Sequence, residues 1–322
     1  MRAVVFDGAG GNEVVQLVER PDPEPGPEDV VVAARFAGMN PADLHQRLGR
    51  YPAPPGAVAD VPGLEVAGTV VAAGERVTAW GVGQRVFGLV AGGGLADRVL
   101  VHERCVTLVP ERMSHAEAAA TPEAFITAHD AVLTQAGLRP GETLLVHGAS
   151  GAVGSAAVQI ALAAGARVLG SVRSDDAAAV VVELGAEAVR DEDLAAAVSA
   201  ATDRRGADVI LELVGAPHFP ANLEVLAMSG RIVVVGVGAG ATIQLDLLGL
   251  MRRRAVMRGT MLRARPLEDK ADAVRAFERE VVPMLADGRV HARVDATFPA
   301  EDVHDAFDRL AERSGKVLLE FP

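Results

Sequence analysis

The sequence has very few of the residues on which disulfides and metal sites usually depend. Its 322 residues include one cysteine, Cys105, and no two of its eight histidines are close enough in sequence to suggest a ligand pair. A single cysteine excludes an internal disulfide and a cysteine-rich metal site. Aromatic residues are also scarce, with one tryptophan, Trp80, and one tyrosine, Tyr51.

Basic clusters and long apolar runs are missing as well. The net charge is −12, and the only basic run is Arg252-Arg253-Arg254, which is short and flanked by apolar residues, so no nucleic-acid surface is expected. No uninterrupted apolar stretch reaches the length of about 18 residues that a transmembrane helix needs. The first ten residues lack a long apolar core and include Asp7, so no secretory signal is expected. We therefore predict a cytoplasmic protein that binds neither nucleic acid nor membrane.

What is present is enough apolar sequence for two domains. Half of the residues are hydrophobic. Up to about residue 121 the sequence reads as many short strands separated by glycine and proline turns, which predicts a compact barrel-like domain. Beyond residue 114, strands and helices alternate, which is typical of a parallel sheet covered on both faces. The expected fold class is α/β, with a doubly wound parallel-sheet domain beside a mostly-β, barrel-like one.

The most informative stretch runs from residue 144 to 164. A short apolar run leads into a turn that contains Gly148, Gly151 and Gly154, and apolar residues then recur at helical spacing. A strand, a glycine turn and a helix N-terminus together can hold a diphosphate. The same spacing also fits a tight turn that binds no ligand. His147, just before the turn, is expected to be a hydrogen-bonded histidine and not an acid.

The end of the next strand suggests which dinucleotide the turn would hold. NAD-binding domains place an acid there, about 20 residues past the glycines, to bind the ribose 2′-hydroxyl. Here that place holds Val172, followed by Arg173 between Ser171 and Ser174. A guanidinium with hydroxyl neighbours suits a 2′-phosphate, so NADPH is favoured over NADH. Alternatively, Arg173 is an ordinary surface arginine near Asp175 and Asp176.

Motifs along nearly the whole chain resemble the zinc-free branch of the medium-chain dehydrogenase/reductase superfamily, and within it the NADPH:quinone oxidoreductases. The match is nearest to the tumour-suppressor-inducible quinone oxidoreductase subgroup. It is carried by Asn40-Pro41-Ala42-Asp43, by residues 46–51, 62–68, 121–123 and 147–154, and by Gly315-Lys316-Val317. The resemblance implies a Rossmann cofactor domain over residues 122–262, inserted in a GroES-like substrate domain over 1–121 and 263–322.

The resemblance also makes one set of positions informative. Where zinc-dependent members carry Cys, His and Cys, this sequence has Asn40, Leu64 and Glu123. An amide, a hydrocarbon and one carboxylate cannot make a tetrahedral N/S zinc site. Because no Lewis acid would then activate an alcohol, an acceptor that takes hydride unaided is expected, namely a small hydrophobic quinone or an enone.

The candidate residues follow from these arguments. Asn40, Asp43 and Tyr51 are expected to orient the acceptor, although Asn40 also suits a turn, Asp43 a helix cap and Tyr51 loop packing. The expected cofactor contacts are Thr127, Ser150, Gly151, Ala152, Val153, Gly154, Ser171, Arg173, Ser174, Val214, Gly236, Val237, Leu262 and Lys316, and no metal ligand is expected.

Two departures from the family and two rival functions remain. The turn has Ala152 where the family usually has glycine, and Ala177 and Glu192 stand where a lysine and a tyrosine usually help with the 2′-phosphate.

The rival enzyme is an NADPH-dependent alkene reductase. The rival from another class is a nucleotide-binding redox sensor with little turnover. A homodimer is expected by analogy, paired through the sheet edge near residues 242–248.

Overall fold

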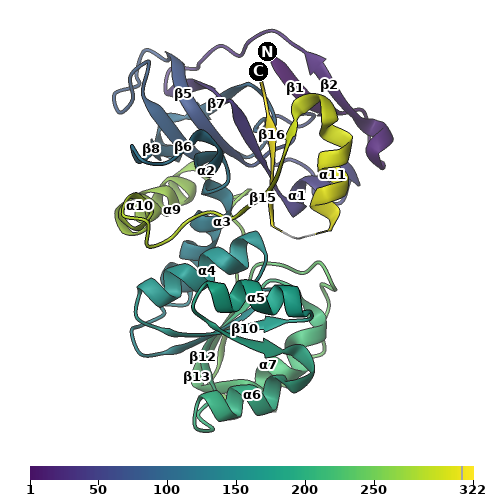
Figure 1. Cartoon of the computed structure of the whole chain (residues 1–322), viewed down its shortest axis with the longest axis vertical. Coiled ribbons are helices and arrows are strands. Elements are labelled where there is room, and N and C mark those ends of the chain that lie inside the picture. The colour runs from purple at the N-terminus through teal and green to yellow at the C-terminus, as the bar shows by residue number, and fades with distance from the viewer. Residues whose placement is uncertain (313–314) are drawn as a thin grey trace. The chain divides into compact units, whose positions relative to one another are not determined.

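The protein divides into two compact units. The structure, a computed structural model, describes residues 1–312 and 315–322. Unit 1 comprises Met1–Ile126 and Leu262–Pro322, and unit 2 comprises Thr127–Met261 (Figure 1). Within the described residues, every helix is too short or too polar to cross a bilayer.

Unit 2 is built on a six-stranded parallel sheet. Its strand order is β11-β10-β9-β12-β13-β14, which is the 3-2-1-4-5-6 order of a Rossmann fold. The strands are β9 (Thr143–His147), β10 (Arg167–Val172), β11 (Glu187–Arg190), β12 (Ala207–Glu212), β13 (Leu226–Val234) and β14 (Val256–Gly259). All five residues of β9 are buried, as expected of a central strand covered on both faces.

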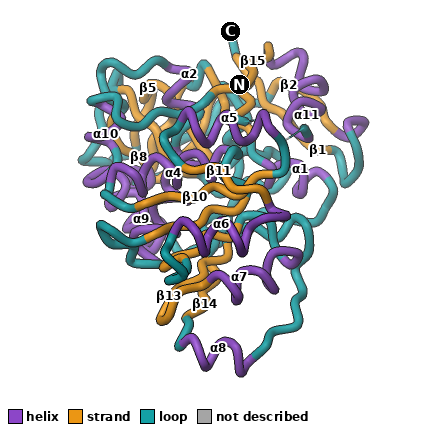
Figure 2. The backbone as a smooth tube through the Cα atoms, turned by 60° about the horizontal axis from the view of Figure 1, so that its bottom comes forward, coloured by secondary structure: helices purple, strands orange, loops and turns teal. Residues whose placement is uncertain are grey.

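Helices connect these strands, and Figure 2 shows them in purple around the orange sheet. They are α4 (Ala152–Ala163), α5 (Asp175–Glu183), α6 (Leu194–Ala201), α7 (Phe219–Val225) and α8 (Leu247–Arg253), with short turns η4 (Asp191–Asp193) and η5 (Ala216–His218). Helix α3 (Pro122–His129) spans the division between the units, and the π-helical η3 (Asp130–Gln135) follows it. The chain reverses direction across the sheet between β9 and β12, and ligands of doubly wound folds bind at such a switch point.

Unit 1 is mostly β. A five-stranded antiparallel sheet has the order β7-β3-β5-β6-β8, a three-stranded sheet has the order β15-β16-β4, and β1 pairs with β2. The strands are β1 (Arg2–Phe6), β2 (Val15–Glu19), β3 (Asp29–Ala33), β4 (Phe36–Met39), β5 (Glu65–Ala73), β6 (Arg85–Leu89), β7 (Arg98–His102), β8 (Val106–Leu108), β15 (Val294–Pro299) and β16 (Lys316–Glu320). The helices are α1 (Pro41–Arg47), α2 (His115–Ala119), α9 (Leu267–Glu280), α10 (Val282–Ala286) and α11 (Val303–Ala311), with turns η1 (Asn12–Val14), η2 (Glu103–Cys105) and η6 (Ala300–Asp302).

Two cores hold unit 1 together. One lies inside the five-stranded sheet and includes Val30, Val32 and Val86. The other packs Phe307 and Leu310 of α11 against β16 and β4. The N-terminal strands and the C-terminal strand belong to the same unit, because the two sequence segments meet in the second of these cores.

The edge strand of the unit 2 sheet differs from the prediction. Residues 242–248 are mostly irregular and enter α8 at Leu247, whereas the outermost strand is β14. Residues 242–248 are therefore not the edge of the sheet, and the edge expected there is the strand β14.

Candidate functional site

The glycine turn joins β9 to α4 in unit 2. Gly148 has a φ of 68°, a conformation that favours glycine. A Cβ on Gly154 would lie 2.2 Å from the carbonyl oxygen of Gly148, so only glycine lets the helix start this close to the turn. Ser150, Gly151, Ala152 and Val153 stay partly exposed at the N-terminus of α4, which offers free N–H groups to an anion. The predicted diphosphate residues thus lie together on one turn.

The residues predicted to contact the 2′ end lie at the end of β10. Ser171 and Val172 are buried, whereas Arg173 is exposed and has no ion-pair partner in the part of the chain that the structure describes. The Ser174 hydroxyl oxygen caps α5 by accepting the N–H of Ala177 at 3.2 Å. Arg173 is therefore unengaged beside a capped helix N-terminus.

Sequence reasoning missed a second arginine at this edge. Arg190 ends β11 and pairs in register with Val172, the residue before Arg173. Its Nη2 lies 3.4 Å from a carboxylate oxygen of Asp175, and its Nη1 is buried with no hydrogen-bond partner among the described residues. Nothing in the sequence reveals which residue pairs across a short strand, so only the structure brings Arg190 here.

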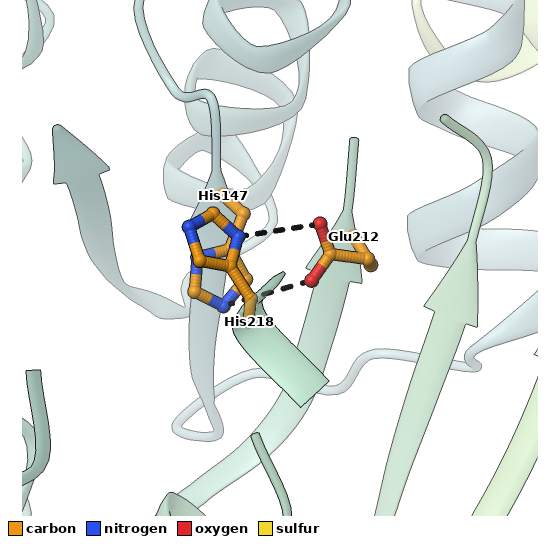
Figure 3. Close-up of side chains that lie close together, drawn as sticks. All are labelled: His147, Glu212 and His218. Atoms are coloured by element: carbon orange, nitrogen blue, oxygen red, sulfur yellow. Dashed lines mark hydrogen bonds and ion pairs between the residues drawn. The ribbon is translucent and has the colours of Figure 1, made fainter. Parts of the chain in front are cut away.

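A cluster of buried polar side chains lies beneath this edge, and Figure 3 shows three of its members. The rings of His147 and His218 stack with centroids 4.0 Å apart. His147 Nδ1 lies 2.9 Å from the Ser171 hydroxyl oxygen, and its Nε2 lies 2.6 Å from the Asn222 amide oxygen. Both ring nitrogens of His147 are hydrogen-bonded, which confirms the interpretation of this residue from the sequence.

Glu212 ties the cluster to the loop after β12. Its Oε1 accepts the backbone N–H groups of Val214 and Gly215, each at 2.8 Å, and its Oε2 accepts the Asn222 amide at 2.8 Å. The Nδ1 atom of His218 lies 3.5 Å from Glu212 Oε1. The predicted contact residue Val214 is thereby fixed by a buried carboxylate.

The cluster shifts the pKa values of its two histidines in opposite directions. Hydrogen bonding to Glu212 and the charges of Glu212 and Asp191 raise the pKa of His218 despite its burial. Burial lowers the pKa of His147. Burial opposes ionisation of Glu212, but His218, His147 and the two backbone N–H groups outweigh it and lower its pKa. His218 is therefore the histidine that carries positive charge most readily.

His147, Glu212 and His218 also form a group whose ligand atoms lie within 4.8 Å of one another, a spacing at which a metal ion can be held. The lone pairs that a cation would need are already used, since Asn222 engages His147 Nε2 and three N–H donors engage Glu212. The stacking also directs the two imidazoles side by side and not toward one point. We interpret the group as a hydrogen-bonded network of polar side chains and not as a metal site.

The other predicted cofactor residues of unit 2 lie on α3 and in the loop after β13. Thr127 is buried on α3. Gly236 needs its missing side chain, because a Cβ there would lie 2.3 Å from the carbonyl oxygen of Leu213. Val237 is 46% exposed. Gly236 and Val237 thus follow the sheet at the end where doubly wound folds bind ligands.

A second polar cluster lies inside unit 1. The Asn40 amide donates to Glu65 Oε1 at 2.8 Å, and its oxygen accepts the Lys316 ammonium at 2.7 Å. Lys316 also pairs directly with Glu65, and both side chains are almost fully buried. The ammonium of Lys316, a predicted cofactor contact, is thus engaged within unit 1. Leu262, another predicted contact, is buried in the same unit.

Asp43 fixes the loop that carries Asn40. One carboxylate oxygen accepts the Asn40 N–H at 2.8 Å, which closes a capping box on α1, and the other accepts the Gly63 N–H at 3.0 Å. Burial raises the pKa of Asp43 to about 6, although the two N–H groups and nearby Lys316 and Arg263 oppose the rise. Both oxygens of Asp43 are committed to backbone groups.

Tyr51 is held by an arginine that sequence reasoning did not assign. The Arg263 guanidinium lies 4.9 Å from the centre of the Tyr51 ring and donates to the Tyr51 carbonyl oxygen at 3.0 Å. It also donates to the carbonyl of Ala91 and to the side chain of Gln46. The Tyr51 hydroxyl has no hydrogen-bond partner among residues 1–312 and 315–322. The ring is thus fixed while its donor stays available.

Glu123 places a second proton-bearing group in unit 1. Its backbone N–H donates to Glu65 at 3.0 Å. Burial and the charge of Glu65 raise the Glu123 pKa to about 8, with Lys316 opposing. Burial and the charge of Glu123 raise the pKa of Tyr51 as well. At neutral pH both groups therefore keep a proton.

The three positions that correspond to zinc ligands keep the donor set expected from the sequence. Leu64 is a buried hydrocarbon, the Asn40 amide is bonded to Glu65 and Lys316, and Glu123 supplies one carboxyl group. These side chains do not supply the three nitrogen or sulfur donors of a zinc dehydrogenase site.

Two families of known proteins match separate parts of the chain. Residues 26–111 match the alcohol dehydrogenase GroES-like domain, and residues 152–279 match the family described as zinc-binding dehydrogenase. With the sheet order of unit 2, these matches confirm the fold class predicted from the sequence.

Curated relatives match almost the whole chain. The quinone oxidoreductase of Lama guanicoe is 31% identical over 99% of this chain and 97% of its own length. The quinone oxidoreductase of Homo sapiens is 30% identical over 98% of this chain and 95% of its own length.

Solved structures are similar over the same span. The quinone oxidoreductase of Pseudomonas syringae pv. Tomato DC3000 has a TM-score of 0.87 at 30% identity and covers 99% of each chain. The CurK enoyl reductase has a TM-score of 0.88 at 27% identity, covering 100% of this chain and 99% of its own. A mycobacterial structure complexed with NADPH has a TM-score of 0.88 at 26% identity and covers 100% of both chains.

Proposed function

The chain belongs to the medium-chain dehydrogenase/reductase superfamily as a quinone oxidoreductase-like oxidoreductase with an NAD(P)-binding domain, and we propose that it transfers hydride from NADPH to a quinone. The observation that carries the proposal is the Tyr51 ring, which Arg263 holds fixed while its hydroxyl remains without a partner among the described residues.

The residues of unit 1 suit the acceptor's oxygen. NADPH, when bound, supplies the hydride. As negative charge develops on the quinone oxygen, the Tyr51 hydroxyl donates a hydrogen bond to it. Forming the hydroquinone consumes one proton in addition to the hydride. The neutral carboxyl group of Glu123 is the nearby group that can supply this proton. Asn40, Asp43, Glu65 and Lys316 keep the surrounding loop in place through the buried contacts described above.

The residues of unit 2 suit the cofactor. We assign the diphosphate to the turn at residues 148–154 and the 2′-phosphate to Arg173, with Ser171 and Ser174 beside it and Arg190 as an additional cation. The NADPH-bound mycobacterial structure supports this cofactor by similarity. We propose unit 2 as the cofactor domain and unit 1 as the substrate domain. The predicted boundaries, 122–262 for the cofactor domain and 1–121 with 263–322 for the substrate domain, differ from these units only in that residues 122–126 and Leu262 fall in unit 1.

We also propose that the reaction proceeds without zinc, as in the zinc-free subgroup that the sequence resembles. The support is chemical, since Asn40, Leu64 and Glu123 do not supply a zinc donor set. Quinones accept hydride without a Lewis acid, so this donor set and this acceptor agree.

One observation favours a second candidate function. The similarity to the CurK enoyl reductase suggests reduction of an enone or enoyl thioester. That reaction uses the same cofactor but must deliver a proton to the α-carbon, and Tyr51 and Glu123 are both protonated at neutral pH.

A steady-state comparison separates these functions. NADPH oxidation is followed with a simple benzoquinone and with an α,β-unsaturated ketone, at matched concentrations and with a chelator present. Faster turnover of the quinone supports the proposal, and faster turnover of the ketone supports the alkene reductase. Tight NADPH binding with neither acceptor reduced would support the redox sensor.

We further propose a homodimer formed through the β14 edge of unit 2. All four residues of β14 are exposed, and in α8, which precedes β14 in the chain and packs on β13, Leu247 and Met251 are 64% and 70% exposed. An edge strand and exposed apolar side chains are features that a second copy covers.

A further inference from the structure

Hydrogen bonds link His147 to Asn222 on one side and, through Ser171, to Asp191 on the other. Asn222 donates its amide N–H to Glu212, so its oxygen faces His147 Nε2, which must then carry a hydrogen. Ser171 has one hydroxyl hydrogen but two neighbours that need it, His147 Nδ1 at 2.9 Å and an Asp191 oxygen at 2.5 Å. Ser171 therefore links His147 to Asp191, and its single hydrogen cannot satisfy both neighbours.

His218 is the histidine of the cluster placed to carry a positive charge beside Asp191. Its Nε2 lies 3.5 Å from Asp191 Oδ2, and its Nδ1 lies 3.5 Å from Glu212 Oε1. The titratable and polar groups that face it come from β9 (His147), β12 (Glu212) and η4 (Asp191). A protonated His218 lies between two carboxylates and neutralises the charge of Asp191.

Asp191 lies beside the end of the cofactor that distinguishes NADPH from NADH. Ser171, which it contacts, is the penultimate residue of the second strand of the doubly wound sheet, and these folds bind the ribose 2′ substituent at the end of that strand. The Asp191 side chain is 24% exposed, so its charge reaches solvent at this edge. A 2′-phosphate carries nearly two negative charges at neutral pH, whereas the 2′-hydroxyl of NADH carries none.

We propose that the cluster of His147, Ser171, Asp191 and His218 sets the preference for NADPH over NADH through the protonation of His218. When His218 is protonated the site accepts the 2′-phosphate of NADPH, and when His218 is neutral the charge of Asp191 repels that phosphate. This inference rests on the proposed NADPH-dependent function and adds residues that set its cofactor specificity. His218 and Asp191 are positioning residues, since they act through charge and through Ser171.

The composition of unit 2 makes the pH dependence specific. Neither lysine of the chain, Lys270 or Lys316, belongs to this unit, and Tyr51 and Cys105 also lie in unit 1. Among the side chains of unit 2, histidine is therefore the type whose ordinary pKa of about 6.5 lies nearest to the range of pH 7 to 9. The pKa of His218 is raised above its usual 6.5, so the proton is present at lower pH and is lost as pH rises through the raised value. The phosphate is already dianionic over this range, since its second pKa is about 6.

The test measures binding of NADPH and of NADH to the purified full chain, without any acceptor, between pH 7 and 9. The ratio of the NADPH Kd to the NADH Kd is expected to rise with pH in the wild type. His218→Asn should raise the ratio at pH 7 by about fivefold, and Asp191→Asn should lower it and remove most of its pH dependence. The double variant should recover most of the loss caused by His218→Asn, because the charge that His218 offsets is gone. His115→Asn, at an exposed histidine of unit 1, is the matched control.

The outcomes separate charge from structure. If His218 only supported the fold, its variant would weaken both nucleotides equally and Asp191→Asn would not rescue it, which would overturn the inference. A ratio that does not change with pH would overturn it as well, while the proposed function stands. Failure of both nucleotides to bind the wild type would overturn the proposed function and this inference together.

Discussion

Arg263 decides what Tyr51 can do. The guanidinium stacks on the ring and donates to the Tyr51 carbonyl oxygen, so both ring and backbone are held by one side chain. Burial and the charge of Glu123 raise the pKa of Tyr51, which keeps its hydrogen on the hydroxyl. A fixed neutral phenol is a hydrogen-bond donor that needs no rearrangement during the reaction.

Removing only the Tyr51 hydroxyl tests this role. Tyr51→Phe keeps the ring on which Arg263 stacks, so the fold and the NADPH Kd should not change. We expect kcat for quinone reduction to fall on the order of 100-fold, because the developing oxyanion loses its donor. Stopped-flow NADPH oxidation measures the step, and an unchanged rate would remove Tyr51 from the mechanism.

The buried pair of Lys316 and Glu65 should matter to stability much more than pairs at the surface. Lys316→Met leaves Glu65 buried and unpaired, and we expect it to lower the free energy of unfolding by about 3–5 kcal/mol. Arg167→Met breaks the exposed pair with Glu187 and should cost less than about 1 kcal/mol. Urea denaturation at pH 7 compares them, and equal losses would contradict the account.

The raised pKa of Glu123 makes stability depend on pH. Between the ordinary value of 4.5 and the folded value of about 8, the folded chain binds a proton that the unfolded chain releases, so this group reduces stability as pH rises through that range. Glu123→Gln should therefore gain about 1–2 kcal/mol over the wild type at pH 8 and little at pH 5. Denaturation at the two pH values measures the difference, with exposed Glu111→Gln as control. An equal effect at both values would argue against a protonated Glu123.

At the scale of elements, the glycine turn combines two requirements that separate variants can distinguish. Gly154 is needed for packing, because a Cβ there would meet the Gly148 carbonyl oxygen at 2.2 Å. A Cβ on Gly151 would meet the same atom only at 3.4 Å, an ordinary contact. Glycine is therefore required for packing at Gly154, whereas Gly151 has space for a side chain beside the turn.

Alanine at each position should give opposite results. We expect Gly154→Ala to destabilise the protein by about 1–3 kcal/mol, as overpacking does. Gly151→Ala should fold normally but bind NADPH more weakly, since the added methyl lies at the exposed N-terminus of α4. Thermal melts and NADPH titrations test both, and normal stability in Gly154→Ala would contradict the packing argument.

Ala152→Gly, followed by NADPH titration, shows whether the extra methyl group of this chain changes the affinity for NADPH.

Much of the element order could be predicted because local sequence determines it. The buried parallel strands are continuous apolar runs. The spacing of Ser114 and Glu117 predicts a capping box, and the two residues form one at the start of α2. The sequence of residues 267–286 predicts one helix, whereas the structure has two, α9 and α10. Pro283 lacks an N–H and cannot continue a helix through its own position, so the chain restarts there.

The sites were harder to predict, because long-range packing assembles them. The glycine turn and Arg173 follow each other closely and were found by spacing. Arg263 reaches Gln46 across 217 residues, and His147 reaches Asn222 across 75, so no local pattern announces either contact. Glu65 begins an apolar strand, and a carboxylate at such a position is expected to need a buried cationic or hydrogen-bonding partner. The structure shows that this partner is Lys316.

At the scale of the whole molecule, the proposed dimer gives a test that is independent of catalysis. Met251→Glu places a charge among the exposed apolar side chains of α8 and should shift a dimer toward monomer. Val82→Glu changes an equally exposed residue of unit 1 and should leave the dimer intact. Sedimentation velocity measures the distribution, and a dimer that resists Met251→Glu would place the interface elsewhere.

The central claim is hydride transfer from NADPH to a quinone by a protein without a zinc site. Its most direct test follows NADPH deuterated at C4 in single turnover with a benzoquinone, with a chelator present throughout. We predict rapid oxidation of NADPH, one hydroquinone formed per NADPH, and a slower rate with the transferred position deuterated. No oxidation under these conditions, or oxidation that appears only when zinc is added, would contradict the account.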